Sequence, residues 1–187
     1  MITGRSLSFL CIFLCIAAVA FSQDAPESTR TEKAALPRSY RAMRLGMSLE
    51  ELKQALLADD LFHFRGDRDV SILPLQEQTL IETTGISFIR RAFFQLEDGK
   101  LFIMSFTLDP NLVDHYSVFT TFVNKYGEPA SLDPKQAVWI NNETRISIER
   151  PLTVKYIDRV VFDELVEQSK AREASELQLR RDFLNEF

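Results

Sequence analysis

The feature that most constrains the fold is a pair of alternating apolar runs joined by one short turn. The runs are ISFIRRAFFQL at residues 86–96 and KLFIMSFTL at residues 100–108, with Glu97-Asp98-Gly99 between them. Aspartate followed by glycine between alternating runs predicts a β-hairpin. Because strand residues alternate between two faces, one face of the second strand should be buried and the sheet covered on one side. That face consists of Phe102, Met104, Phe106 and Leu108.

A first helix is predicted before this hairpin. Ser48 stands three residues before Glu51, which is the spacing of a capping box at a helix start. Leu49, Leu52 and Leu56 follow at helical spacing. We therefore interpret Ser48 as a helix cap and not as a nucleophile, because a nucleophile elbow requires a second glycine that the chain lacks here.

A second helix is predicted after the hairpin. Asp109-Pro110 supplies an N-cap residue and a proline suited to the first helical position. Gly127 and Pro129 are typical of a helix end. The apolar stripe expected between these signals consists of Leu112, Tyr116, Phe119, Val123 and Tyr126.

Further short apolar runs are typical of strands. LFHF and VSIL flank RGDRD between residues 61 and 73 and predict a second hairpin. AVWI, RISIE and LTVKYI predict three more strands between residues 137 and 157. The order of elements predicts an α+β fold, with an antiparallel sheet of hairpins, helices packed on one face and a C-terminal helix. This order is compatible with two helix-hairpin repeats.

The N-terminus predicts export. Arg5 is followed by an apolar stretch at residues 7–21, with Ala18-Val19-Ala20 and Ala20-Phe21-Ser22 as two possible cleavage sites. The stretch is shorter than the roughly 20 residues of a membrane-spanning helix, so we expect cleavage, with an uncleaved anchor as the alternative. No membrane span is expected after cleavage. The predicted organisation is a signal peptide at 1–22, a flexible leader at 23–39, an α+β domain at 40–158 and a charged helix at 159–187.

Composition narrows the chemistry and the partners. Cys11 and Cys15 both lie inside the predicted signal peptide, so the mature chain would contain no thiolate nucleophile or cysteine metal ligand. The formal charge is -5, without the basic face that nucleic acid or anionic lipid would require. We therefore expect no nucleic-acid partner.

The segment LGMSLEELKQALL, Leu45–Leu57, carries a family resemblance. It resembles the helix start of the small outer-membrane assembly lipoproteins called SmpA/OmlA and the helix-hairpin modules of β-lactamase-inhibitor-like proteins. The resemblance covers one helix and hairpin, and the chain departs from it in lacking a lipidated cysteine. It implies a periplasmic, non-enzymatic module that works by surface contact.

Several polar residues are candidates for a metal, adhesive or modification site. His63 and His115 would form a metal site only if the fold joined them, with Asp67 or Asp69 as a further ligand, and no metal-binding motif supports this. We predict no catalytic, cofactor or metal site. Arg65-Gly66-Asp67 spells an adhesive tripeptide and is also ordinary turn composition. Asn142-Glu143-Thr144 is a glycosylation sequon on a predicted turn.

Two surfaces remain as binding hypotheses. The C-terminal helix carries Leu177, Leu184 and Phe187, which we predict to dock into a protein partner in the cell envelope. The aromatic residues form either a packed core or a cavity for a small apolar ligand between sheet and helices. They are Phe93, Phe94, Phe102, Phe106, Tyr116, Phe119, Phe122 and Trp139. The leading hypothesis is an exported interaction or scaffold protein, the alternative is a ligand-binding protein, and an enzyme ranks third; the sequence leaves the oligomeric state open.

Overall fold

The computed structural model describes residues 35–73 and 78–187. Internal contacts divide the chain into two units, residues 1–32 and residues 33–187, of which the second contains all the described residues. The predicted signal peptide at 1–22 and the leader up to residue 34 lie outside the described residues.

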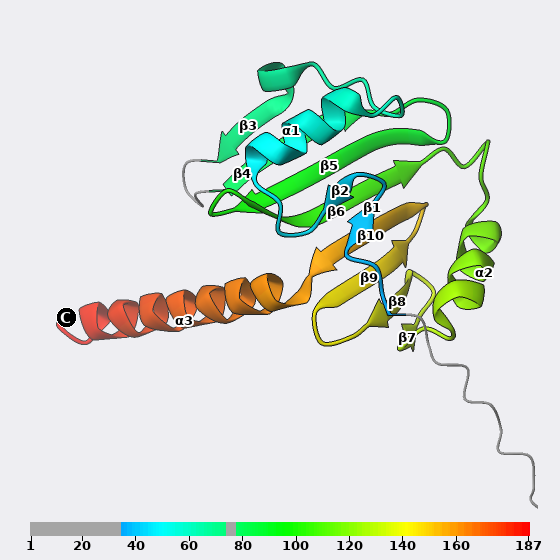
Figure 1. Ribbon diagram of the computed structural model, residues 1–187. Coiled ribbons are helices and arrows are strands. Elements are labelled where there is room, and N and C mark those ends of the chain that lie inside the picture. Colours follow the sequence, from blue (N-terminus) through cyan, green and yellow to red (C-terminus); the bar gives the residue numbers. More distant parts are fainter. Residues whose placement is uncertain (1–34, 74–77) are drawn as a thin grey trace, which may run out of the picture. The chain divides into compact units, whose positions relative to one another are not determined.

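The second unit is built on one eight-stranded antiparallel sheet (Figure 1), with the strand order β3-β4-β5-β6-β10-β9-β8-β7. Its strands are β3 (Val70–Leu73), β4 (Gln78–Thr84), β5 (Ile89–Glu97), β6 (Lys100–Leu108), β7 (Ser131–Leu132), β8 (Gln136–Ile140), β9 (Thr144–Glu149) and β10 (Thr153–Asp158). The other elements of the described chain are β1 (Ser39–Tyr40), β2 (Met43–Arg44), η1 (Gly66–Asp69), α1 (Leu49–Ala58), α2 (His115–Tyr126) and α3 (Arg159–Leu184). The predicted α+β class is confirmed.

Each half of the sheet is a four-stranded meander preceded by one helix. The first half runs from α1 through β3, β4, β5 and β6, and the second runs from α2 through β7, β8, β9 and β10. The halves join where β6 pairs antiparallel with β10. A shared order of elements does not establish a repeat, so the helix-hairpin repeat stays a prediction.

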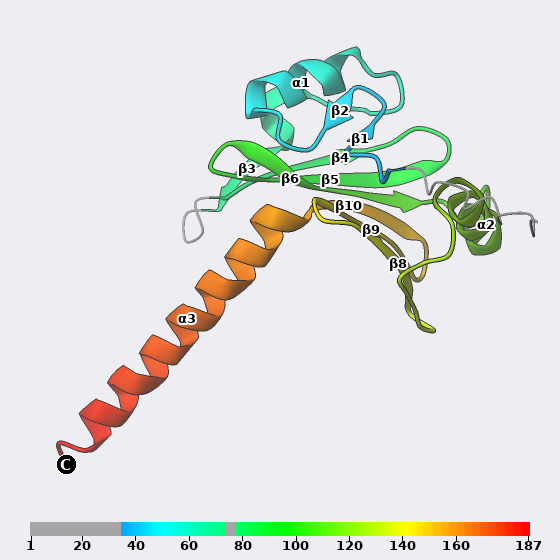
Figure 2. The ribbon, with the colours of Figure 1, turned by 60° about the horizontal axis from the view of Figure 1, so that its bottom comes forward.

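One face of the sheet carries the hydrophobic core. Pairing between neighbouring strands places a row of buried side chains on that face: Phe94, Met104, Tyr156, Ile146 and Trp139. From α1, Leu52 and Leu56 join the same core, and from α2 the rings of Phe119 and Phe122 lie 6.0 Å and 5.5 Å from the Trp139 ring. Both helices therefore pack on one face, as predicted. Figure 2 shows α1 on one side of the sheet and α3 leaving on the other.

The capping box of α1 forms as predicted. Ser48 Oγ accepts a hydrogen bond from Glu51 N at 3.4 Å, and Glu51 Oε2 accepts one from Ser48 N at 2.7 Å. The residue before the cap, Met47, accepts a backbone hydrogen bond from Leu101 N at 2.9 Å. This bond ties the start of the helix to β6, so α1 is fixed over the first half of the sheet.

The second helix begins later than the predicted start at Asp109. α2 starts at His115 with Asp114 as its N-cap. Asp109 instead stabilises a separate turn, because its Oδ1 accepts hydrogen bonds from the backbone N and the side-chain Nδ2 of Asn111, both at 2.9 Å. The end at Gly127 agrees with the prediction, and the φ of 75° there is one that glycine tolerates. The prediction of a proline-started helix at Pro110 was wrong.

Three aromatic residues predicted for the core lie elsewhere, namely Tyr116, Phe93 and Phe102. Tyr116 is 73% exposed and lies in the first turn of the shortened helix. Phe93 pairs with Ser105 on the face opposite the core row. Leu112, predicted for the helix stripe, precedes the helix and is 56% exposed.

The predicted hairpin between LFHF and VSIL is also wrong. Phe62 bridges to Gly85 instead, and β3, which contains VSIL, pairs with β4. The intervening RGDRD segment contains η1, a 3₁₀ turn that redirects the chain and prevents the direct pairing.

A bulge changes which residues of β6 face the core. Gln95 pairs with Ile103 whereas Leu96 pairs with Leu101, so Phe102 is an additional residue in the β6 strand. Leu101 consequently takes the place predicted for Phe102 in the core. The alternation predicted for the rest of this strand is retained.

Packing extends ahead of the predicted domain boundary at Tyr40. Leu36 is partly buried against the core, and Arg38 forms an ion pair with Asp158 at 2.5 Å. Asp158 is also the N-cap of α3, because its Oδ1 accepts a hydrogen bond from Val161 N at 3.4 Å. The segment before β1 is therefore held beside the start of the last helix.

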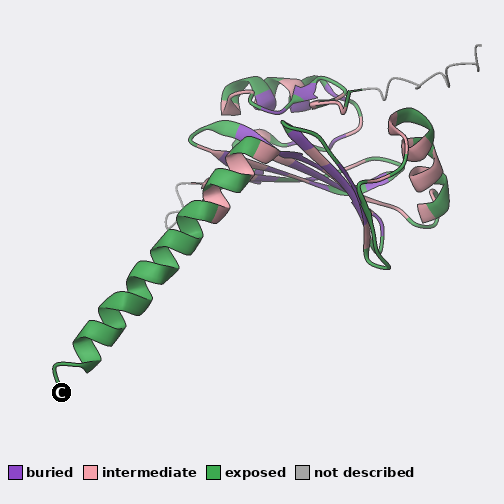
Figure 3. Cartoon of the chain, turned by 90° about the horizontal axis from the view of Figure 1, so that it is seen from below, coloured by how far each residue is buried: buried purple, intermediate pink, exposed green. Residues whose placement is uncertain are grey.

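The C-terminal helix is confirmed as α3. Its first turns are partly buried, but every residue from 167 to 187 is exposed (Figure 3). No helix within the described part of the chain has the length and apolar character needed to cross a membrane.

Candidate functional site

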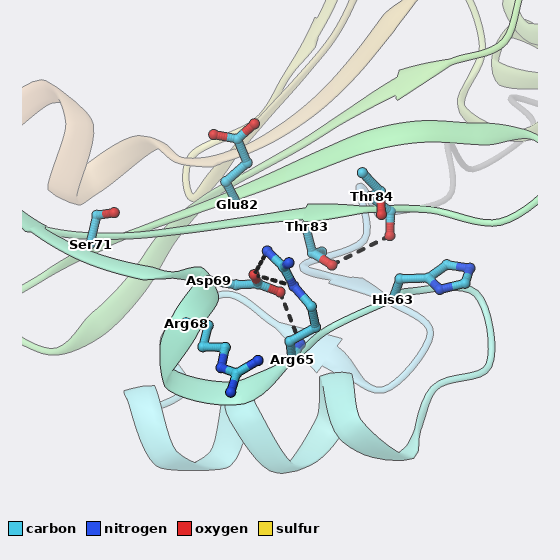
Figure 4. Close-up of a pocket in the computed structure, with 8 residues that line it drawn as sticks. All are labelled: His63, Arg65, Arg68, Asp69, Ser71, Glu82, Thr83 and Thr84. Carbon is cyan, nitrogen blue, oxygen red and sulfur yellow. Dashed lines mark hydrogen bonds and ion pairs between the residues drawn. The ribbon is translucent and has the colours of Figure 1, made fainter.

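The first candidate site is a polar cavity of about 470 Å³ beside η1 (Figure 4). One wall comes from the loop after α1, from η1 and from the start of β3, and the opposite wall comes from β4. The lining residues are His63, Arg65, Arg68, Asp69, Ser71, Glu82, Thr83 and Thr84. Arg65 of the predicted adhesive tripeptide lines this cavity, so the geometry of the cavity shows how that residue is used.

Arg65 is used to hold a buried carboxylate. Its Nε and Nη2 donate to Asp69 Oδ1 at 2.9 Å and 2.5 Å, and its backbone N donates to Asp69 Oδ2 at 2.9 Å. Burial of Asp69 opposes ionisation, but the hydrogen bonds and the positive charge of Arg65 outweigh burial and lower the pKa of Asp69. Figure 4 shows the guanidinium turned toward Asp69. The pair therefore stabilises the turn.

The second charge of the tripeptide is engaged as well. Asp67 Oδ1 accepts a hydrogen bond from Lys53 Nζ of α1 at 2.6 Å. Gly66 adopts a φ of 75°, which suits glycine at the start of η1. The adhesive function of Arg65-Gly66-Asp67 stays a prediction, and both of its charged groups already serve the fold.

The other charged or titratable residues of this cavity are Glu82, Arg68 and His63. Glu82 forms an ion pair with Arg91 at 3.3 Å. His63 is fixed through its backbone, whose N–H donates to Thr84 O at 2.9 Å. No side-chain partner is recorded within the described residues for Arg68 or for the imidazole of His63. The first cavity is thus a polar surface cavity, and its buried carboxylate, Asp69, is already paired with Arg65.

The second candidate site is a cavity of about 420 Å³ between α2 and the β7–β8 hairpin. Its polar lining residues are His115, Asp133, Gln136 and Arg150. Its apolar and aromatic lining residues are Tyr116, Phe119, Leu132 and Ala137. This cavity lies between the sheet and a helix, where the small-ligand hypothesis expected one.

The imidazole of His115 is the unusual group of this second cavity. Its Nε2 is buried and has no hydrogen-bond partner in the described structure. Burial and then the positive charge of Arg150 lower the pKa of His115, against the opposing effect of Asp114. Folding therefore favours the neutral form of the His115 imidazole.

The two histidines do not form the metal site that was weighed from the sequence. His63 lines the first cavity and His115 lines the second. Across residues 35–73 and 78–187, no three histidine, cysteine, aspartate or glutamate side chains gather in a way that could hold a metal ion.

The predicted docking residues lie on the exposed part of α3 and just beyond it. Leu177 is 50% exposed, Leu184 is 58% exposed and Phe187 is 95% exposed. Two further exposed apolar residues, Leu179 and Phe183, belong to the same segment, and the Phe183 and Phe187 rings lie 5.2 Å apart. The i, i+4 spacing of the two phenylalanines is the sequence signal that would have added Phe183.

Sequence reasoning missed the residues that surround His115. Arg150, Leu132 and Gln136 come from the β7–β8 hairpin and from the turn after β9. No local motif links them, because only the pairing of β7, β8 and β9 brings them beside α2. The sequon residue Asn142 lies exposed in the β8–β9 turn.

Comparison with known proteins places most of this fold within one family. A model of the TP0088 domain matches residues 38–168. This range includes both cavities and the first turns of α3, whereas the docking residues lie beyond its end. No curated protein and no solved structure matches the chain.

Proposed function

The chain belongs to the TP0088 domain family, and we propose that it is an exported, non-enzymatic, envelope-associated module that binds a protein partner. The sheet and the helices α1 and α2 would supply the rigid platform. The distal part of α3 would supply the contact through Leu177, Leu184 and Phe187.

One observation carries this proposal: the last 21 residues are exposed and yet contain large apolar side chains. In proteins most helical stability comes from packing of an apolar face, so a partner that covered this segment would stabilise it. Burying each large apolar side chain is worth roughly 1.5–3 kcal/mol. A helix that presents spaced apolar anchors is the usual ligand of a hydrophobic groove.

The proposed location follows from the N-terminal sequence. The apolar stretch at residues 7–21 and its small-residue cleavage sites support export to the periplasm or the exterior, with an uncleaved anchor as the alternative. The resemblance of Leu45–Leu57 to SmpA/OmlA-type and inhibitor-like modules supports the same assignment.

A non-enzymatic role is favoured by the character of the first cavity. Its best-positioned carboxylate, Asp69, is committed to Arg65 through three hydrogen bonds. A general acid or base must instead be within reach of a substrate proton.

Cross-linked co-purification from the native cell envelope tests the docking helix. The full chain is compared with Leu177→Asp/Leu184→Asp and with the matched control Leu179→Asp. At 3.6 residues per turn, Leu177 and Leu184 share one side of α3 and Leu179 lies on the opposite side. We expect the double variant to lose a defined partner that the full chain and the control retain.

Equal capture by all three proteins would overturn the docking helix, as would the absence of any defined partner. Sedimentation of the purified full chain distinguishes a second copy of this chain from a different protein. A concentration-dependent dimer that the double variant abolishes would identify the partner as the chain itself.

A second function, binding of a small apolar ligand between sheet and helices, is favoured by the cavity beside α2. The cavity combines four apolar or aromatic lining residues with four polar ones, so it offers both an apolar surface and polar groups that could orient a ligand.

A further inference from the structure

We propose that the cavity between α2 and the β7–β8 hairpin binds a small monocarboxylic acid with an apolar body. Arg150 would hold the carboxylate, His115 Nε2 would bond to one of its oxygens, and Phe119 and Leu132 would contact the body. This inference goes beyond the docking of α3 and rests on the second proposed function, ligand binding.

The cavity has the size and the lining that such a ligand needs. Its volume of about 420 Å³ lies within the usual range for small-molecule sites. Phe119 and Ala137 belong to the helix and the sheet, so two structural elements supply apolar surface from opposite sides. Leu132 and Tyr116 are 64% and 73% exposed and would lose water contact when a ligand is bound. A simple inorganic anion would leave this apolar surface unused.

Arg150 is held in place with its outer nitrogens available. Its Nε donates to Pro134 O at 2.9 Å, and its backbone N donates to Lys135 O at 2.8 Å. Neither Nη1 nor Nη2 has a recorded partner in the described part of the chain. A guanidinium fixed in this way keeps its two outer N–H groups for one carboxylate, and such paired bonds combine charge with geometry.

His115 adds a group that lacks a hydrogen-bond partner among the described residues. A buried polar atom without a hydrogen bond costs free energy, and its Nε2 is such an atom. A carboxylate oxygen could accept a hydrogen bond from Nε2 in the tautomer that carries the proton there. The ligand would then satisfy Arg150 and His115 together, which a purely apolar molecule cannot do.

Asp133 sets the number of negative charges. Its Oδ1 accepts hydrogen bonds from the backbone N of Lys135 at 2.7 Å and of Gln136 at 3.0 Å. The bond from Lys135 is the largest of the effects that lower the pKa of Asp133. This carboxylate is therefore ionised and committed to the turn. Because it lines the same cavity as Arg150, it would repel a second negative charge, so a monocarboxylate is favoured over a dicarboxylate.

Calorimetric titration of the full chain provides the test. The probes are 3-phenylpropionate, its uncharged analogue 3-phenylpropionamide, and the dicarboxylate succinate. We expect 3-phenylpropionate to bind with a Kd on the order of 0.1–1 mM, a range typical of a small ligand with few anchoring groups. The amide and succinate should each bind at least about tenfold more weakly than 3-phenylpropionate. The amide lacks the negative charge that Arg150 would bind, and succinate carries a second negative charge that Asp133 would repel.

Two arginine variants form the matched pair. Arg150→Gln should weaken 3-phenylpropionate at least about tenfold and remove the preference for acid over amide. Arg68→Gln, which changes an arginine of the other cavity, should leave both unchanged. If Arg150→Gln does not fold, the acid-to-amide ratio of the wild-type chain and Arg150→Lys, which lacks the planar fork, still decide the question.

Three results would overturn the proposal. They are no binding of 3-phenylpropionate up to about 10 mM, equal binding of acid and amide, or equal weakening by the two arginine variants. Equal partner capture by the full chain and the Leu177→Asp/Leu184→Asp variant, together with the expected acid binding, would refute the docking function alone. Loss of capture in that variant, together with no binding of 3-phenylpropionate by the full chain, would refute ligand binding alone.

Discussion

The two helices on the core face differ in how completely they are buried. α1 places Leu52 and Leu56 in the core at 0% and 1% exposure, and its start is tied to β6 by backbone hydrogen bonds. α2 has no buried residue and rests on Trp139 through partly buried rings. The cavity beside η1 contains a carboxylate, Asp69, that is paired with Arg65, whereas the cavity beside α2 contains a buried histidine nitrogen with no hydrogen-bond partner among the described residues. We therefore expect the more tightly covered half to support the fold and ligand binding to occur beside the less covered helix.

The side chains explain this difference. Leu52 and Leu56 of α1 are fully buried in the hydrophobic core. The aromatic side chains of α2 are wide, and Phe119 and Phe122 approach the Trp139 ring at interplanar angles of 49°. A cavity of about 420 Å³ lies between α2 and the β7–β8 hairpin.

The largest effect that separates the two helices is expected from truncation of their apolar residues. Leu52→Ala should lower the free energy of unfolding by about 3 kcal/mol, because it leaves a cavity in a fully buried site. Val118→Ala in the partly buried α2 should cost less than about 1.5 kcal/mol. Urea unfolding of both variants checks this order, and equal losses would show that α2 is packed as tightly as α1.

A smaller effect is expected from the acidic residues of η1. Asp69→Asn should cost about 1–2 kcal/mol near pH 7, because the Asp69 side chain is 2% exposed and bonded to Arg65. Asp67→Asn, the matched control, should cost less than about 1 kcal/mol, because Asp67 is 87% exposed. Since folding lowers the pKa of Asp69, its contribution is present above 3.8 and is lost as the pH falls through the lower folded value. Unfolding should be measured between pH 7 and pH 2 for wild type, Asp67→Asn and Asp69→Asn. The wild-type and Asp67→Asn curves should be similar, and both should approach the Asp69→Asn curve at acid pH. A constant difference in stability from Asp69→Asn would contradict this.

His115 should have a still smaller effect on stability, in a pH range above that of Asp69. Its pKa is lowered by burial and by Arg150, with Asp114 opposing them and with Asp133 also lining the cavity. The unfolded chain therefore takes up the proton first, so stability should fall as the pH drops through 6.5 and level off below the folded value. His115→Gln should lack this decline. Thermal unfolding between pH 8 and pH 5 measures it, and an unchanged slope in the variant would assign the decline to another group.

The smallest effect on stability is expected from removal of the exposed helix. Truncation after Gln168 should change the free energy of unfolding by no more than about 0.5 kcal/mol, since the removed residues are exposed. The same truncation should abolish partner capture. A large loss of stability would mean that distal α3 packs against the domain.

The sequence predicted those parts of the fold that local signals determine. The hairpin around Gly99, the capping box at Ser48 and the end of α2 at Gly127 all depend on residues close together in the chain. Errors arose where distant contacts decided the outcome. Asp109 had the signals of a helix start, yet its side chain closes a turn with Asn111, and VSIL pairs with β4 and not with the nearer LFHF.

The candidate site was less predictable than the fold. The sequence identifies His115 as a candidate through its residue type alone, whereas Arg150 lies in no local motif that would predict a site. The two become neighbours only because β7, β8 and β9 pair beside α2 and place their connections at one edge of the cavity. Such an arrangement depends on strand order, and no spacing in the sequence encodes it.

Ligand binding is proposed for the α2 half of the domain, and the α1 half is expected to support the fold. Backbone amide shifts of the isotopically labelled full chain, recorded during titration with 3-phenylpropionate, test it most directly. The prediction is that the largest shifts fall at His115, Tyr116, Leu132, Gln136 and Arg150. The largest shifts at His63, Arg65, Arg68 and Ser71, or no localised shifts at all, would contradict it.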